Sequence, residues 1–263
     1  MHGQAALRSR NLWSQNVELL CLLVSKDLRV RYKSSFLGYL WALANPLAFT
    51  IVYYIVFQLI LRVQMPHFGV YLVTGIFPWT WMANALWQSS GAYRGNSSLI
   101  RKVNLSRPVL PLSSAVQEMV HFCFAIPVLI VAVVWSGGRF HLSWLVLIPL
   151  MILVELAVIY PVGMILAVAN VFVRDVEYLI GIVLQLLFFL TPIVFPESGI
   201  PDRYRPFFEW NPFFHMIRAW REVFYSGRLD LDAVSLCLVF ASSTGVLAWF
   251  VHRKLNARVG ELL

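Results

Sequence analysis

Residues 29–61 read RVRYKSSFLGYLWALANPLAFTIVYYIVFQLIL. Three basic side chains, Arg29, Arg31 and Lys33, come directly before an uncharged run that extends from Ser34 to Leu61. A helix needs about 20 apolar residues to cross a bilayer, and this run is longer than that. Basic residues beside a span are retained on the cytoplasmic side of the membrane. The segment therefore predicts a transmembrane helix whose N-terminal end is cytoplasmic.

The composition of the whole chain agrees with a membrane location. The protein has 263 residues, of which 59% are hydrophobic and 13% charged, and its mean hydropathy is +0.71. Soluble domains carry about 25% charged residues, roughly twice this share. The net charge of +8 can indicate nucleic-acid binding. Here the basic residues lie beside predicted spans, where the positive-inside rule explains them, so we expect a lipid bilayer and no nucleic acid as partner.

The pattern of uncharged runs predicts six transmembrane helices in one domain covering residues 36–263. The expected spans are residues 36–61, 63–93, 109–135, 144–172, 178–196 and 233–251. An even number of spans places both termini on the same side, and two thirds of the 21 Lys and Arg residues fall on that side. Both termini are therefore expected to be cytoplasmic, and the fold class is an all-α integral membrane protein.

Two segments on the cytoplasmic side are predicted to be amphipathic helices. In residues 12–33, apolar side chains recur at steps of three and four, which is typical of a helix lying in the membrane interface. Its expected apolar face consists of Trp13, Val17, Leu20, Val24 and Leu28. The loop of residues 94–108 is basic and without acids, and it predicts a short helix. Each segment is either a plain membrane anchor or a docking site for a cytosolic protein.

The segment of residues 197–230, before the last span, is rich in aromatic residues and divided by three prolines. It predicts two short helices that form a re-entrant hairpin at the outer mouth of a pathway; the alternative is a pair of helices lying flat in the interface. On the second helix, Arg218, Arg221 and Glu222 are expected away from the apolar face, with Arg218 and Glu222 four residues apart and able to pair.

The sequence offers little for catalysis. It contains no GxxxxGK[ST] loop, no HExxH and no GxSxG motif, and its six His and three Cys residues are dispersed, so we expect no metal site. Glu118 and Glu155 lie within predicted spans, where a charge costs roughly 2.5–3.5 kcal/mol, and must face protein or water. They are either packing elements or part of a proton relay. The first span also carries an aromatic stripe. It is either a surface along which a sugar chain slides or a part of ordinary helix packing.

Four motifs carry a resemblance that covers nearly the whole chain. They are RYKSSFLGYLWALANPL (31–47), LIRKVNLSRPVLPL (99–112), NVFVRDVEYLIGIVLQLLFFLTPIVFP (170–196) and NPFFHMIRAWREVFYSG (211–227). In order and spacing, the sequence resembles the membrane subunits of ATP-binding-cassette exporters for O-antigen and related polysaccharides. The resemblance implies a six-span permease without catalytic activity that works as a homodimer in the bacterial inner membrane. It also implies two copies of a separate cytoplasmic ATPase, which bind ATP and magnesium, and a lipid-linked polysaccharide as substrate.

The resemblance also assigns roles to individual residues. The expected ATPase-coupling residues are Lys26, Arg29, Ser98, Leu99, Ile100, Arg101, Lys102 and Val103. The expected conduit lining is Tyr39, Tyr53, Phe57, Phe188 and Phe189, and the expected gate is Phe213, Phe214, Ile217 and Trp220. No cofactor is expected in this chain itself.

Two other functions stay open at this point. The same architecture can export a drug or a small lipid, for which a closed aliphatic cavity would be typical. A membrane-embedded transferase acting on a lipid carrier is the alternative from a different class. Glu118, Glu155 and His215 are its only candidate catalytic residues.

Overall fold

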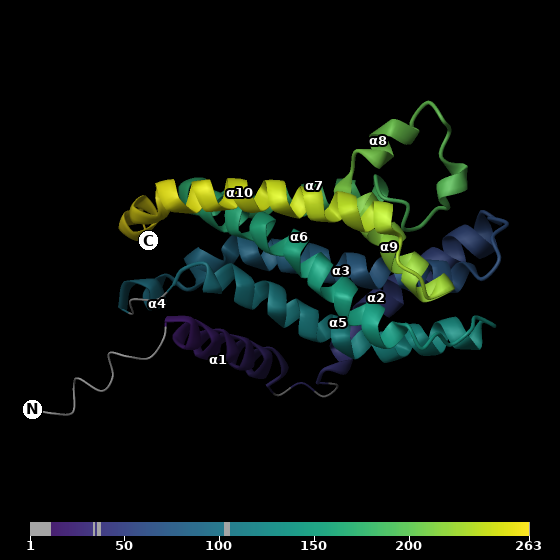
Figure 1. The fold of residues 1–263 in the computed structure, drawn as a ribbon. Helices are drawn as coiled ribbons and strands as arrows, with labels where there is room; N and C mark the ends of the chain where they lie inside the picture. Colours follow the sequence, from purple (N-terminus) through teal and green to yellow (C-terminus); the bar gives the residue numbers. More distant parts are fainter. Residues whose placement is uncertain (1–11, 34, 36–37, 103–105, 263) are drawn as a thin grey trace, which may run out of the picture.

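The computed structural model describes residues 12–33, 35, 38–102 and 106–262, and every regular element in them is a helix. The elements are α1 (Leu12–Tyr32), α2 (Leu40–Tyr53), the π-helix η2 (Tyr54–Ile60), α3 (Phe68–Gly95), α4 (Ser97–Lys102), α5 (Val109–Trp135), α6 (Trp144–Phe172), α7 (Val176–Phe189), the 3-10 helix η3 (Glu197–Gly199), α8 (Arg205–Glu209), α9 (Pro212–Ser226) and α10 (Leu231–Leu262). The long helices run side by side as an elongated bundle (Figure 1). The prediction of an all-α fold is confirmed.

Four helices in the described ranges are long and apolar enough to cross a membrane. They are Leu40–Ile60, which joins α2 and η2, then α5, α6 and the Leu231–Asn256 part of α10. The two other predicted spans also exist as helices: α3 is long but more polar, and α7 has 14 residues. A multi-pass membrane protein is thereby supported, while the count of six spans stays a prediction.

Helix α3 occupies the centre of the bundle, which explains its polar residues. It packs against α2, α5, α6, α7 and α9, and most of its side chains are buried. The contact with α6 is close because Gly163 lies opposite Ser89: a Cβ atom at Gly163 would lie 2.8 Å from the Ser89 side chain. The buried hydroxyl groups of Thr74 and Ser90 donate to backbone carbonyls of α3 itself.

Helix α7 ends earlier than predicted. The expected span continues to Pro196, but the helix stops at Phe189 and an irregular segment follows. Pro192 explains the end, because proline has no backbone N–H and disfavours the helical conformation of the residue before it. The freed carbonyl groups find other donors: the Asn211 amide donates to the Leu190 carbonyl over 3.2 Å.

A second, smaller apolar cluster joins α1 and α4 to one end of the bundle, where the ends of α3, α6 and α10 and the start of α5 also meet. On α1, Leu23 and Val24 are buried and Leu20 is half-buried against this cluster. Val17, expected on the same face, is 39% exposed, because the buried face is shifted toward Leu23. Arg107 ties the loop after α4 to α10, since it donates to the side-chain oxygen of Asn256 over 2.8 Å.

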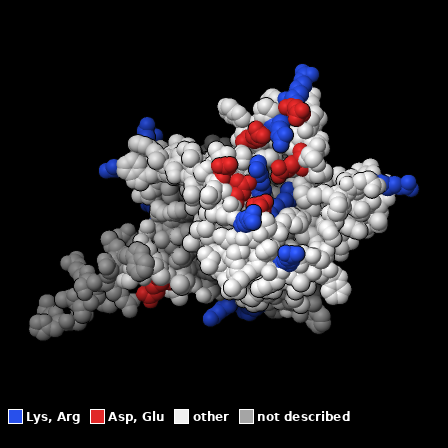
Figure 2. All heavy atoms as spheres, turned by 45° about the vertical axis from the view of Figure 1, so that its right-hand side comes forward, with Lys and Arg blue, Asp and Glu red and all other residues white. Residues whose placement is uncertain are grey.

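The opposite end of the bundle carries α8 and α9 (Figure 1). Figure 2 shows acidic and basic side chains gathered over this end, and few on the surface around it. Several of these charges are paired: Arg205 lies 3.3 Å from Glu209, and Arg218 lies 2.8 Å from Asp230. Charges concentrated beyond the apolar lengths of the long helices fit a protein whose middle lies in lipid.

Candidate functional site

A cavity of about 330 Å³ opens between α2, α3 and α7, and we call it the aromatic groove. Its aromatic walls are formed by Phe49, Tyr53, Trp79, Phe188 and Phe189. The ring of Tyr53 stacks on Phe188 at a centroid distance of 5.6 Å, and Trp79 meets Phe188 edge-on at 5.8 Å. Asn45, Thr80, Asn84 and Gln185 add polar groups. The groove therefore presents flat apolar faces beside hydrogen-bonding groups.

The sequence of α2 explains why Tyr53 reaches this groove. Pro46 lies inside the helix and removes one backbone donor, and the Thr50 hydroxyl donates to the Pro46 carbonyl over 2.8 Å. Directly after Tyr53 the chain changes to the π-helix η2. Such π-segments are rare and occur frequently at functional sites. On α2 the Phe49 ring stacks on Tyr53, and the Tyr53 ring in turn stacks on Phe188 of α7.

The structure brings together three of the five predicted conduit residues. Tyr53, Phe188 and Phe189 line the aromatic groove. Phe57 lies one turn further along the same helix, with its ring centroid 6.3 Å from that of Tyr53. Tyr39 lies elsewhere, with its ring 4.4 Å from that of Tyr32. The sequence reasoning missed Trp79, because aromatic residues on a central helix look the same whether they pack or line a cavity.

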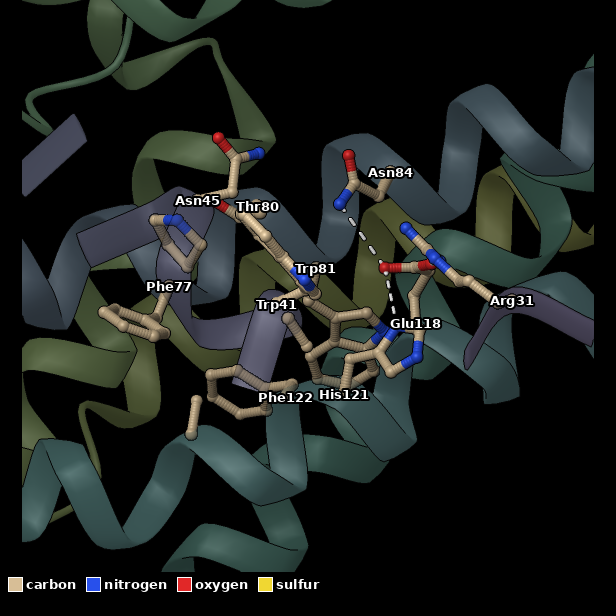
Figure 3. A pocket seen from close by; sticks show the side chains of 13 residues that line it. Arg31, Trp41, Asn45, Phe77, Thr80, Trp81, Asn84, Glu118, His121 and Phe122 are labelled. Atoms are coloured by element: carbon tan, nitrogen blue, oxygen red, sulfur yellow. Dashed lines mark hydrogen bonds and ion pairs between the residues drawn. The ribbon is translucent and has the colours of Figure 1, made fainter. Parts of the chain in front are cut away.

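Glu118 is the polar centre of the bundle (Figure 3), although only 2% of its surface is exposed. Its carboxylate accepts hydrogen bonds from Arg31 of α1 and from Gln88 of α3. Asn84 of α3 lies 3.4 Å away, and Nδ1 of His121, one turn along α5, lies 3.2 Å away. One carboxylate thus holds three helices, α1, α3 and α5, and its negative charge is balanced by Arg31.

The last turn of α1 makes a second bond into the same cluster. The hydroxyl of Tyr32 lies 3.0 Å from Nε2 of His121, so an imidazole with its proton on Nδ1 accepts from Tyr32 and donates to Glu118. Burial raises the pKa of the Tyr32 phenol above its ordinary value of 10.0, which keeps this donor protonated. The predicted coupling residues Lys26 and Arg29 are both exposed, and Lys26 lies 2.8 Å from its neighbour Asp27.

Arg221 fixes α9 to the irregular segment after α7. Its guanidinium donates to the Pro192 carbonyl over 2.6 Å, the Ile193 carbonyl over 3.1 Å and the Tyr71 hydroxyl over 2.8 Å. The same group lies 3.5 Å from the centre of the Tyr71 ring, which adds a cation–π contact. Gly75 makes room for it, because a Cβ atom there would lie 2.7 Å from the guanidinium.

This arrangement corrects two sequence predictions about α9. Arg221 was expected away from the buried face, but it is only 6% exposed. Arg218 pairs with Asp230 at 2.8 Å instead of Glu222, whose carboxylate accepts from Ser226 over 2.5 Å. The reason is that α9 packs against neighbours on several sides, so a single apolar face does not describe its burial.

The four predicted gate residues are all core residues of α9. Phe213, Phe214, Ile217 and Trp220 are each less than 8% exposed. Phe213 meets Trp79 edge-on at 6.2 Å, which connects α9 to the wall of the aromatic groove. The Trp220 indole donates to Glu155 of α6 over 2.6 Å.

The candidate residues for a membrane enzyme are occupied by structural contacts. Glu155 is fully buried beneath Trp220, and the His215 ring lies 2.7 Å from the Glu209 carbonyl. Glu118 lines a cavity of about 60 Å³, enough for water but not for a lipid carrier. Within the described ranges, no three His, Cys, Asp or Glu residues come together as a metal site. Glu155 therefore faces protein and Glu118 faces protein and a water-sized cavity, in agreement with the prediction that both acids face protein or water.

Helix α4 has the two faces that its sequence predicts. Leu99 and Ile100 are half-buried against the second apolar cluster. Ser98, Arg101 and Lys102 are exposed. Val103, the last predicted coupling residue, lies outside the described residues. Helix α4 and the N-terminal part of α1 lie near each other at one end of the bundle (Figure 1), where both contribute to the second apolar cluster.

Comparison with known proteins extends over most of the chain. The family pattern of the ABC-2 type transporter matches residues 18–225. The O-antigen export system permease protein RfbA of Klebsiella pneumoniae is 37% identical over 246 residues, which are 94% of this chain and 95% of that protein. Its namesake in Myxococcus xanthus is 31% identical over 86% of this chain and 90% of its own length. The polysialic acid transport protein KpsM of Escherichia coli is 27% identical over 80% of this chain and 82% of its own length. The chain therefore belongs to the membrane-subunit family of ABC-2 type transporters.

Proposed function

We propose that this chain is the membrane half of an ATP-powered exporter that moves a lipid-linked O-antigen or related polysaccharide across the inner membrane. The observation that carries the proposal is the aromatic groove, in which Tyr53, Trp79 and Phe188 present stacked and edge-on rings beside amide groups. Aromatic faces contact sugar rings without demanding one sequence of sugars. The names of the relatives, O-antigen export permease and polysialic acid transport protein, point to the same class of cargo.

The proposed topology has six spans, with α3 and α7 as the second and fifth, and both termini in the cytoplasm. The basic residues on α1, on α4 and near the end of α10 support this orientation, because these elements gather at one end of the bundle. At the opposite end, α8 and α9 form the proposed outer hairpin, and Arg221 anchors it to the irregular segment after α7. That segment lies against protein, which is the condition for irregular backbone at membrane depth.

The proposed energy source is a separate ATPase, two copies of which serve a homodimer of this chain. Arg101 and Lys102 on α4, together with Lys26 and Arg29 on α1, offer exposed positive charge for docking. Movement of α1 would reach the bundle through Arg31 and Glu118. ATP then acts by shifting the population between two arrangements of the docked helices.

The first test is affinity purification of this chain from its native membrane in mild detergent, followed by an ATPase assay on the proteins that accompany it. We expect an ATP-hydrolysing partner in a one-to-one ratio. Replacing Arg101 and Lys102 by Glu should release that partner, whereas the same replacement of Arg203 and Arg205, at the α8 end, serves as the matched control. A chain that purifies alone from its own membrane, without ATPase activity, would remove the basis of the proposal.

Export of a drug or small lipid by the same architecture receives less support. Such a cargo would suit a closed aliphatic cavity, whereas the aromatic groove is open and carries Asn45, Thr80 and Gln185 beside its rings. Export assays that compare the polysaccharide with an amphiphilic dye separate the two cargoes directly.

A further inference from the structure

A second cavity, of about 360 Å³, lies at the end of the bundle that carries α1 and α4. It is bounded by α1, α3, α5 and the first turn of α7, and it shares no lining residue with the aromatic groove. Its volume lies within the roughly 300–1,000 Å³ of small-molecule sites. Its polar lining includes Asp27, Gln88, Asn96, Gln117 and Glu177. We call it the polar pocket.

Gln117 is the residue that most clearly indicates a ligand. It is only 5% exposed, it lines the polar pocket, and its amide has no hydrogen-bond partner among the residues that the structure describes. An amide that is open to a cavity and has both a donor and an acceptor unused is suited to a ligand with hydroxyl groups, which also donate and accept.

Other lining groups add the same kind of contact. The amide NH₂ group of Gln88 donates a hydrogen bond to Glu118, and that of Asn96 donates to the Ala92 carbonyl over 2.9 Å. Each of the two residues therefore retains its side-chain oxygen as an acceptor. The Glu177 carboxylate overhangs α3 at Gly91, where a Cβ atom would lie 3.8 Å from it.

Trp87 supplies the apolar face. It lines the polar pocket and is 49% exposed, on the same helix as Gln88. An exposed indole beside amides and a carboxylate matches a sugar ring, which has a flat C–H face and a rim of hydroxyl groups.

The charges select against an anion. Arg31 is engaged by Glu118, and Asp27 pairs with Lys26 at 2.8 Å. Glu177 has no ion pair among the described residues and leaves the polar pocket with a surplus negative charge. A phosphate or an acidic sugar would be repelled, whereas an uncharged sugar hydroxyl can donate to the carboxylate.

We propose that the polar pocket binds an uncharged sugar unit of the polysaccharide, with Gln117 and Glu177 contacting its hydroxyl groups and Trp87 its ring face. This inference rests on the proposed export function and adds a sugar-recognition site, distinct from the aromatic groove, at the end of the bundle where α1 and α4 lie. The carrier's phosphates bind elsewhere, because the surplus charge of the polar pocket is negative.

The test uses the full chain with its ATPase in cells that make the polysaccharide. A photo-crosslinking benzoylphenylalanine replaces Val30, an exposed residue lining the polar pocket, and in a second strain it replaces Phe189 in the aromatic groove. We expect glycan-bearing adducts at both positions, and mass spectrometry of the hydrolysed Val30 adduct should identify a neutral sugar. Gln117→Leu should lower the Val30 adduct about tenfold, the loss of one to two hydrogen bonds. Gln64→Leu, the same change at an exposed residue of the loop after η2, should leave it unchanged.

The outcomes separate this inference from the proposed function. Adducts at Phe189 without adducts at Val30, or a Val30 adduct that survives Gln117→Leu or contains an acidic sugar, would overturn the sugar site and leave export intact. Absence of glycan at both positions would overturn the export proposal together with the site. Size-exclusion elution and membrane insertion of Gln117→Leu check that the variant is folded, and Glu177→Lys gives an independent loss of the neutral sugar.

Discussion

Replacing Arg31 by Gln tests whether the last turn of α1 holds this helix to the bundle. Arg31 is the cation that balances the buried carboxylate of Glu118, and the two residues lie on α1 and α5. Removing it leaves that carboxylate with His121, Gln88 and Asn84 as its neighbours. We expect α1 to detach more easily, while the rest of the bundle stays folded.

The magnitude follows from the burial of the two partners. The Glu118 side chain is 3% exposed, whereas that of Arg31 is 43% exposed. Breaking a fully buried pair costs about 3–5 kcal/mol, and an exposed pair contributes about 0–1 kcal/mol. The Arg31–Glu118 pair is half-buried, and Glu118 keeps other hydrogen-bond donors when Arg31 is replaced. The free-energy cost of breaking this pair should therefore lie between these limits, at about 1–3 kcal/mol. Each 1.4 kcal/mol corresponds to a tenfold change, so the opening equilibrium of α1 should shift by about 5- to 140-fold.

Hydrogen exchange of α1 amides measures this equilibrium directly, because local opening limits their exchange. The protein is compared in the same lipid nanodiscs as wild type, Arg31→Gln, Glu118→Gln and the double variant. Exchange should accelerate in residues 19–29 and stay unchanged in α6. The double variant should exchange about as fast as the faster single variant, since both substitutions remove the same interaction.

Two results would refute this reasoning. Equal exchange of α1 in wild type and Arg31→Gln would mean that its apolar contacts through Leu23 and Val24 alone hold the helix. Strictly additive effects of the two substitutions, within about 0.3–0.5 kcal/mol, would mean that the residues act independently. Arg29→Gln is the matched control, because Arg29 is exposed on the same helix and should have no effect.

Other substitutions test the remaining contacts. Arg221→Met should destabilise the α8–α9 end by about 1–3 kcal/mol, because the Ile193 carbonyl loses its donor, while the Tyr71 hydroxyl can still donate to the Pro192 carbonyl. Thermal unfolding in detergent measures this, and an unchanged midpoint would contradict it. Gly163→Ala should cost about 1–3 kcal/mol by forcing α6 from α3, and Gly181→Ala, where nothing lies within 4 Å, is its control. Tyr53→Ala should slow export of long polysaccharide chains more than short ones; equal slowing would assign the ring to packing alone.

Hydropathy and charge predicted the helices well, because a run of uncharged residues has few alternatives to a buried or lipid-facing helix. The amphipathic character of α1 and of α4 also followed from the sequence, since their charged residues recur on one face. The end of α7 at Phe189 was not predicted, although the sequence contains Pro192 three residues later. The irregular segment after Phe189 also depends on residues distant in sequence, because Arg221 and Asn211, some twenty to thirty positions later, donate to its carbonyl groups.

The polar contacts of the site were the least predictable part. Arg31 and Glu118 are 87 positions apart, and Arg221 and Tyr71 are 150 positions apart. The sequence does not show that Arg31, one of several basic residues before the first span, has a buried partner. An arginine such as Arg221, on a helix rich in aromatic residues, is expected to face solvent. Only the packing of the helices shows which of these charges is enclosed.

The distribution of polar and apolar contacts indicates where the bundle can move. Helices α3 and α6 approach closely at Gly163 and Ser89, and such close packing resists sliding. By contrast, α1 is joined to α5 partly through Glu118. Hydrogen bonds to carboxylate oxygens can be exchanged for water when a helix shifts, whereas a tight apolar contact cannot. We therefore expect α3, α6 and the buried α9 to behave as one rigid unit, and conformational change to take place where α1 attaches.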